Sequence, residues 1–203
     1  MAEYGLDKPL SAQYFDYLGN LAHGDLGPSL KYKDKNVQDI IREGFPVTAT
    51  IGFFALTLAL TLGSLLGIFA ALRQNTLGDY SVMGIAMIGI CIPIFVIGPV
   101  LIVIFGVKLG WLPTGRLDRG QMTFQTLLLP VITLALPYTA VISRLMRASM
   151  IEVLQSGYIR TAKAKGLSRV AVIRRHGLRA AFLPIVSYLG PATARVITGS
   201  LVI

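Results

Sequence analysis

The chain has 203 residues, of which 54% are hydrophobic and only 14% charged, and its mean hydropathy is +0.66. This composition excludes an ordinary soluble domain, in which about a quarter of the residues are charged. The formal net charge is +9. Bases beside apolar spans normally set membrane orientation, so a nucleic-acid partner is not expected.

Residues 1–44 form the first segment and carry five bases and seven acids. A net negative segment is typical of the face exported from the cytoplasm, which predicts that residues 1–44 are extracytoplasmic. The sequence shows no signal peptide. An external start without a preceding span, and an apolar run that is cut at Ile203, lead us to expect a fragment of a longer protein.

Four apolar runs follow, and each exceeds the roughly 20 helical residues that cross a hydrocarbon core of about 30 Å. They predict an all-α, polytopic transmembrane bundle with four spans. Six of the ten prolines lie in the last three of these runs, two in each, where kinks are expected. Gly63 and Gly67 form a small-xxx-small pattern that allows two helices to approach closely. The predicted spans cover about residues 45–72, 80–107, 121–143 and 180–203.

Most of the net charge lies between the third and fourth runs, in a predicted cytoplasmic loop over residues 144–179. Loops rich in Lys and Arg stay on the cytoplasmic side. With Ala180 included, the segment holds one acid, Glu152, and nine bases: Arg144, Arg147, Arg160, Lys163, Lys165, Arg169, Arg174, Arg175 and Arg179. Its length and patterning suggest a function beyond topology.

A helix, a glycine turn and a second helix are predicted inside this loop. Tyr158, Ile159 and Ala162 are spaced to share one apolar helix face. Gly166 is placed to end that helix in the left-handed conformation, and Ser168 is placed to cap the next one. From the residues alone, docking to a protein partner and lying on anionic lipid are equally consistent with this pattern.

Three stretches of the sequence resemble a known family. Residues 156–168 read SGYIRTAKAKGLS, and residues 175–181 continue as RHGLRAA. This resembles the "EAA" loop of ABC-importer permeases in the peptide branch, with Arg-Thr-Ala at 160–162 in place of Glu-Ala-Ala. Residues 21–29 and 197–202 also resemble the B-type transmembrane subunit of oligopeptide importers.

The resemblance implies a type I, MetI-like permease fold with six spans, four of them in this chain. It implies that the loop over 156–181 couples transport to a separate ATPase subunit. That subunit would bind ATP and Mg, so no cofactor is expected in this chain. It also implies a second permease, two ATPase subunits, an extracytoplasmic peptide-binding protein and a bacterial inner membrane. The expected coupling residues are Tyr158, Ile159, Arg160, Ala162, Lys163, Gly166, Leu167 and Arg175.

The sequence lacks the motifs of an enzyme: it holds no P-loop, no H-E-x-x-H and no paired cysteines, so no catalytic or metal-binding residue is expected. An ion-coupled secondary transporter is the alternative, although no predicted span contains Asp or Glu. Arg195 is the one charge inside the spans. It is a candidate for the translocation pathway, with pairing to a neighbouring subunit and snorkelling to the interface as alternatives.

Overall fold

The computed structural model describes residues 8–29, 31–32, 35–114 and 122–199. Within these ranges the chain is helical, and its one pairing of extended backbone is an isolated bridge between Pro28 and Asn36. The all-α prediction is therefore confirmed for the described part. The chain divides into two units, Met1–Val47 and Thr48–Ile203.

The first unit contains α1 (Leu10–Ala22) and the beginning of α2 (Val37–Leu72). Two glycines with positive φ follow α1, Gly24 with φ 79° and Gly27 with φ 77°. The side chain of Asp25 accepts a hydrogen bond from the Gly27 backbone at 2.9 Å. This hydrogen bond stabilises the turn in the connection between the two helices.

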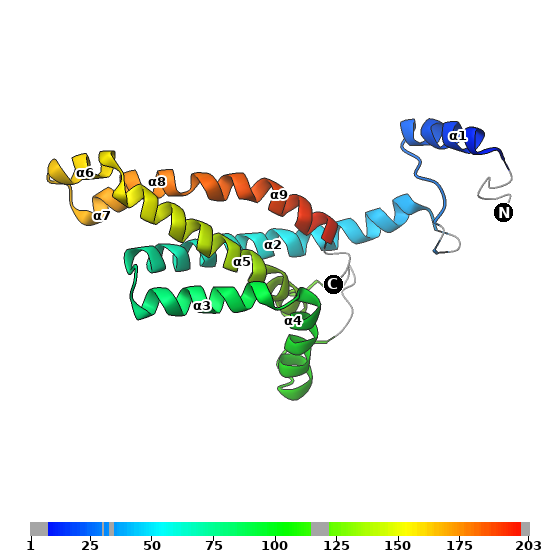
Figure 1. Ribbon diagram of the computed structural model, residues 1–203. Helices are drawn as coiled ribbons and strands as arrows, with labels where there is room; N and C mark the ends of the chain where they lie inside the picture. Colours follow the sequence, from blue (N-terminus) through cyan, green and yellow to red (C-terminus); the bar gives the residue numbers. More distant parts are fainter. Residues whose placement is uncertain (1–7, 30, 33–34, 115–121, 200–203) are drawn as a thin grey trace. The chain divides into compact units, whose positions relative to one another are not determined.

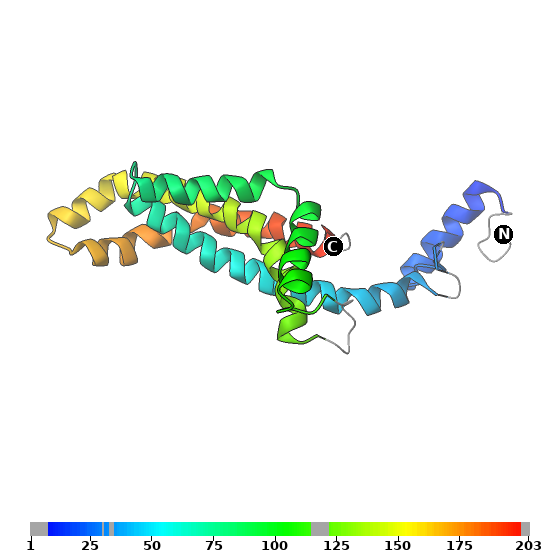
Figure 2. The ribbon, with the colours of Figure 1, turned by 90° about the horizontal axis from the view of Figure 1, so that it is seen from below.

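The second unit continues α2 and builds a bundle of helices around α5. In Figures 1 and 2, α2, α3, α5 and α9 lie side by side, while α6 and α7 stand at the end where α2 passes into α3. The helices are α3 (Leu77–Cys91), α4 (Ile94–Leu101), α5 (Phe124–Gln155), α6 (Gly157–Ala164), α7 (Arg169–Val172), α8 (Leu178–Ala181) and α9 (Leu183–Gly199), with π-helical segments at Ile102–Lys108 and Ile173–Gly177.

Two helices, α2 and α5, are each long and apolar enough to cross a membrane. Two bent pairs of helices, Leu77–Cys91 with Ile94–Lys108 and Arg169–Ala181 with Leu183–Thr198, would raise the number of spans to four. The expected four spans are consistent with this result. A helix suits such a span because it satisfies its own backbone groups in lipid.

The run over 80–107 is broken near its middle, where the axis turns by 100° between α3 and α4. Ile92 has extended backbone angles, and Pro93 follows it with φ −62°. A proline disfavours helical geometry in the residue before it and has no N–H to continue the ladder. The expected kink is confirmed, but the run is not the straight helix that its hydropathy suggests. Pro130 and Pro137, in contrast, lie inside the continuous helix α5.

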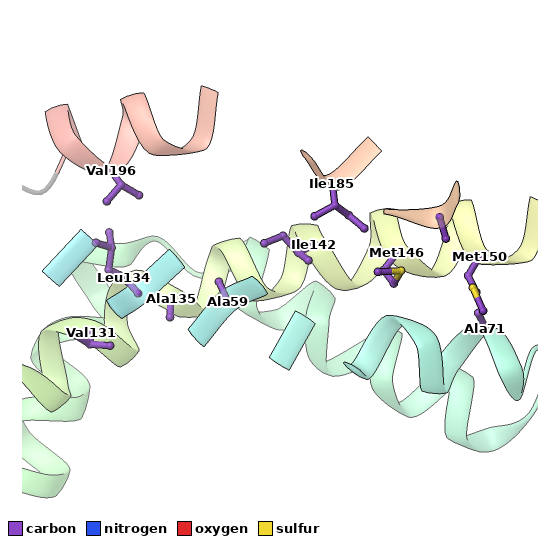
Figure 3. Packing of buried hydrophobic residues seen from close by; sticks show 12 residues of the cluster. Ala59, Ala71, Val131, Leu134, Ala135, Ile142, Met146, Met150, Ile185 and Val196 are labelled. Carbon is purple, nitrogen blue, oxygen red and sulfur yellow. The ribbon is translucent and has the colours of Figure 1, made fainter. Parts of the chain in front are cut away.

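The core of the second unit lies where α5 meets α2 and α9. Figure 3 shows Ile142, Met146 and Met150 of α5 pointing among side chains of the neighbouring helices. Ala59 of α2 and Ile185 of α9 are completely buried in the same cluster. Small residues on α2 opposite large ones on α5 allow the two helices to interdigitate.

Gly63 confirms the small-xxx-small prediction. A β-carbon at this position would lie 2.8 Å from the carbonyl oxygen of Thr139 and 2.9 Å from Cβ of Ile142. Real β-carbons do not approach other atoms so closely, so the backbone of α2 rests directly on α5 here.

Candidate functional site

The predicted cytoplasmic loop begins inside a helix. The charge pattern assigned residues 144–155 to the loop. In the structure they are the last three turns of α5, which ends at Gln155. Most of these residues favour helices, and nothing in residues 144–155 breaks the helix. Ser156 then takes an extended conformation, with ψ 155°, and α6 starts at the next residue. A single residue, Ser156, thus connects α5 to α6.

The expected helix, glycine turn and helix are confirmed over 157–172. Gly166 has φ +80°. Its N–H donates to the carbonyl of Lys163 at 3.0 Å, and the N–H of Leu167 donates to that of Ala162 at 3.4 Å. These two bonds form a Schellman motif, which satisfies carbonyls at the end of α6. Ser168 caps α7 by accepting a hydrogen bond from the Ala171 backbone.

Ile159 and Ala162 face the inside of this loop. Ile159 is fully buried and Ala162 is 7% exposed, and both pack with the buried Val172 of α7 and the partly buried Val153 of α5. Although both are predicted coupling residues, Ile159 and Ala162 are therefore not on the exposed surface of the loop. The apolar face of α6 is covered because α7 folds back on it across the Gly166 turn.

Tyr158 and Leu167 remain accessible, with 48% and 37% of their surface exposed. Val170 on α7, which the sequence reading did not single out, is 64% exposed. The predicted coupling bases Arg160, Lys163 and Arg175 are exposed as well. The loop thus presents apolar side chains among cations, a combination that suits an acidic protein groove or a membrane surface. Their coupling role stays a prediction.

Arg147 does not belong to this exposed set, because it is paired with Asp79 on α3. Its Nε donates to Oδ1 and its Nη2 to Oδ2 of Asp79, each at 2.6 Å. The Asp79 side chain is 1% exposed and also accepts the Asn75 backbone N–H at 2.9 Å. One signal in the sequence pointed to this pair: a lone acid at the edge of an apolar run needs a partner when it is buried.

Arg195 lies on α9, which packs on α5. Tyr188 precedes it by two helical turns on α9, and Tyr138 lies on α5. Both tyrosines are partly buried against the core, while Arg195 is exposed. The sequence reading missed the tyrosines because Tyr138 is distant in the chain. All three residues thus lie on α5 and α9, two helices that are in contact.

No group of three or more potential metal ligands exists among His, Cys, Asp and Glu in the described ranges. Cys91 is a free, exposed thiol at the end of α3.

Comparison with known proteins identifies relatives along the whole chain. A family model described as "Binding-protein-dependent transport system inner membrane component" matches residues 63–203. The chain is 52% identical over 202 residues to the oligopeptide transport system permease protein OppB of Escherichia coli (strain K12), covering 100% of this chain and 65% of that protein. It is 43% identical over 202 residues to the dipeptide transport system permease protein DppB of Bacillus subtilis (strain 168), covering 100% of this chain and 64% of that protein. The chain thus spans somewhat less than two thirds of the length of these relatives.

Proposed function

The chain belongs to the family of binding-protein-dependent transport system inner membrane components, and from this we propose that it is a transmembrane subunit of an ATP-driven importer of oligopeptides. It is a multi-pass protein of the bacterial inner membrane. Support for the substrate class comes from identity, which is higher to the oligopeptide permease (52%) than to the dipeptide permease (43%). In this proposal the chain lines the translocation pathway together with a second, related permease subunit.

Coupling to ATP hydrolysis is assigned to the loop over 156–181. The observation that carries this assignment is a folded helix–turn–helix at one end of the bundle with Tyr158, Leu167 and Val170 exposed among cations (Figure 1). Such a surface suits a groove on an ATPase subunit that offers apolar pockets and carboxylates. Two ATPase subunits would bind ATP and Mg, and an extracytoplasmic binding protein would deliver the peptide.

Arg195 is assigned to the translocation pathway in the same proposal. A guanidinium inside a span normally faces a water-filled cavity or a partner. Tyr138 of α5 and Tyr188 of α9 lie on the same two contacting helices, and their hydroxyls would offer donors and acceptors to a peptide backbone.

The proposal is tested on the complete complex in proteoliposomes. Uptake of labelled peptides of graded length should require ATP, the binding protein and the ATPase subunits. Uptake that follows a proton or sodium gradient without hydrolysis would instead identify a secondary transporter. A permease that purifies without an ATPase, while its loop binds anionic vesicles, would support the lipid-surface interpretation.

Topology is tested separately with single cysteines at Lys31 and Lys165 in a Cys91→Ser background. The proposed orientation places Lys31 outside and Lys165 inside. An impermeant maleimide should therefore label position 31 in intact cells and position 165 only after permeabilisation. The reverse pattern would invert the topology.

A further inference from the structure

The turn between α2 and α3 is built around one carboxylate. Asn75 has φ 62°, an uncommon value for a residue other than glycine, and its N–H points at Asp79. Asp79 is the third residue of α3, where the helix N-terminus favours a negative charge. Arg147 supplies two further donors, so both carboxylate oxygens are satisfied although the side chain is buried.

Arg147 lies near the end of α5 that leads into the loop. Arg147 precedes the end of α5 at Gln155 by eight residues, which is about 12 Å along a helix. α5 is continuous over that distance. The guanidinium therefore lies on the same uninterrupted helix that leads to Ser156 and the start of α6.

The other contacts between α3 and α5 are weak and do not fix the orientation of one helix relative to the other. Arg144 reaches the sulfur of Met87 at 3.9 Å, and a β-carbon on Gly89 would make ordinary van der Waals contact with Ala140. Within the described residues, Asp79 and Arg147 form the one ion pair between these helices. Apolar helix faces in lipid have no hydrophobic force that fixes their register, whereas a two-point ion pair fixes both position and orientation.

We infer that Asp79 and Arg147 are positioning residues that make α3 follow α5 when the loop over 156–181 is displaced. The inference rests on the coupling role proposed for that loop. A displacement of α3 would be transmitted through the bend at Pro93 to α4. Helix α4 in turn packs on α5, where Gly98 lies against Thr133. The ion pair thereby links ATPase-driven motion of the loop to the helices around the pathway.

The deciding variant removes both partners. A single substitution leaves a buried charge without its partner and lowers stability, which says nothing about coupling. Replacing both partners of a buried ion pair by hydrophobic residues of similar volume is often tolerated. Asp79→Leu/Arg147→Met should therefore insert, bind the ATPase and hydrolyse ATP at the basal rate. It should import at least fivefold fewer peptides per ATP than the wild type.

Arg144→Gln is the matched control, because it removes an exposed cation and its long contact with the Met87 sulfur one turn earlier on the same helix, while the ion pair stays intact. It should keep the wild-type ratio of peptide imported to ATP hydrolysed. Arg147→Lys keeps the charge but not the two-point contact and covers the case in which the double variant does not assemble. We expect it to assemble with a lowered ratio.

The outcomes separate this inference from the proposed function. A wild-type complex that lacks an ATPase or imports no peptide would reject the proposed function itself. If the wild type couples normally, a wild-type ratio in the double variant would make the pair purely structural and overturn the inference. When the double variant does not assemble, a wild-type ratio in Arg147→Lys would overturn it equally.

Discussion

Gly67 and Ser143 lie so close together that a β-carbon on the glycine would stand 2.5 Å from the carbonyl oxygen of the serine. The same β-carbon would lie 2.6 Å from Cβ of Met146. Neither neighbour is the tip of a flexible side chain. The distance between α2 and α5 is therefore set by the absence of a side chain at position 67.

Gly67→Ala should force α2 and α5 apart and destabilise the bundle by about 1–3 kcal/mol, the usual cost of overpacking a core. Gly84→Ala on α3 is the control, because a β-carbon there meets no atom within 4 Å. Thermal unfolding in detergent should show a lower Tm for Gly67→Ala and an unchanged or higher Tm for Gly84→Ala. Equal Tm values for Gly67→Ala and the wild type would contradict the close approach.

Gly166→Val should disturb the loop through its backbone alone. The position has φ +80°, and a β-carbon would meet nothing within 4 Å, so the cost is conformational and on the order of 1–2 kcal/mol. We expect loss of the ATPase from the purified complex, or loss of hydrolysis stimulated by binding protein and peptide. Gly166→Asn is the control, since asparagine tolerates the left-handed region. Equal loss in both variants would mean that the glycine matters for a reason other than its φ.

Ile159 and Tyr158 are adjacent in sequence but should behave oppositely. Ile159→Ala removes buried volume from the contact of α6 with α7, at a cost of about 2–5 kcal/mol, and should accelerate amide hydrogen exchange over 157–172. Tyr158→Ala should leave exchange in the free permease unchanged and weaken only retention of the ATPase. Faster exchange in Tyr158→Ala would show that this side chain supports the loop rather than a partner.

Arg195→Leu should impair transport of peptides while insertion and Tm stay near the wild-type values, because its exposed side chain contributes little to packing. Arg195→Lys, which retains the charge, should preserve more of the uptake. Wild-type uptake and complex yield in Arg195→Leu would identify a snorkelling residue instead.

Local features of this chain were predictable from its sequence. Long charge-free runs specify apolar helices, because a helix satisfies its backbone hydrogen bonds in lipid within a single segment. The Gly166 turn followed from a glycine after a basic helix end and a serine that can cap the next helix. In each case the relevant atoms lie within a few residues of one another.

Features that depend on distant residues were not predictable in the same way. Asp79 and Arg147 are 68 positions apart, and the charge count assigned Arg147 to an exposed loop. The burial of Ile159 required knowing that α7 folds back onto α6. Pro93 indicated a kink, but the 100° turn depends on how α4 packs on α5.

The loop has its own small core, which forms without a partner and consists of Ile159, Ala162 and Val172. A partner that binds Tyr158 and its neighbours therefore meets a preorganised surface, and the chain entropy of α6 and α7 has already been lost during folding. The heat-capacity change of association should therefore correspond to the area buried between two rigid surfaces. It should lack the additional negative contribution that arises when a segment folds on binding. Repeated engagement and release during turnover would then proceed without refolding the loop in each cycle.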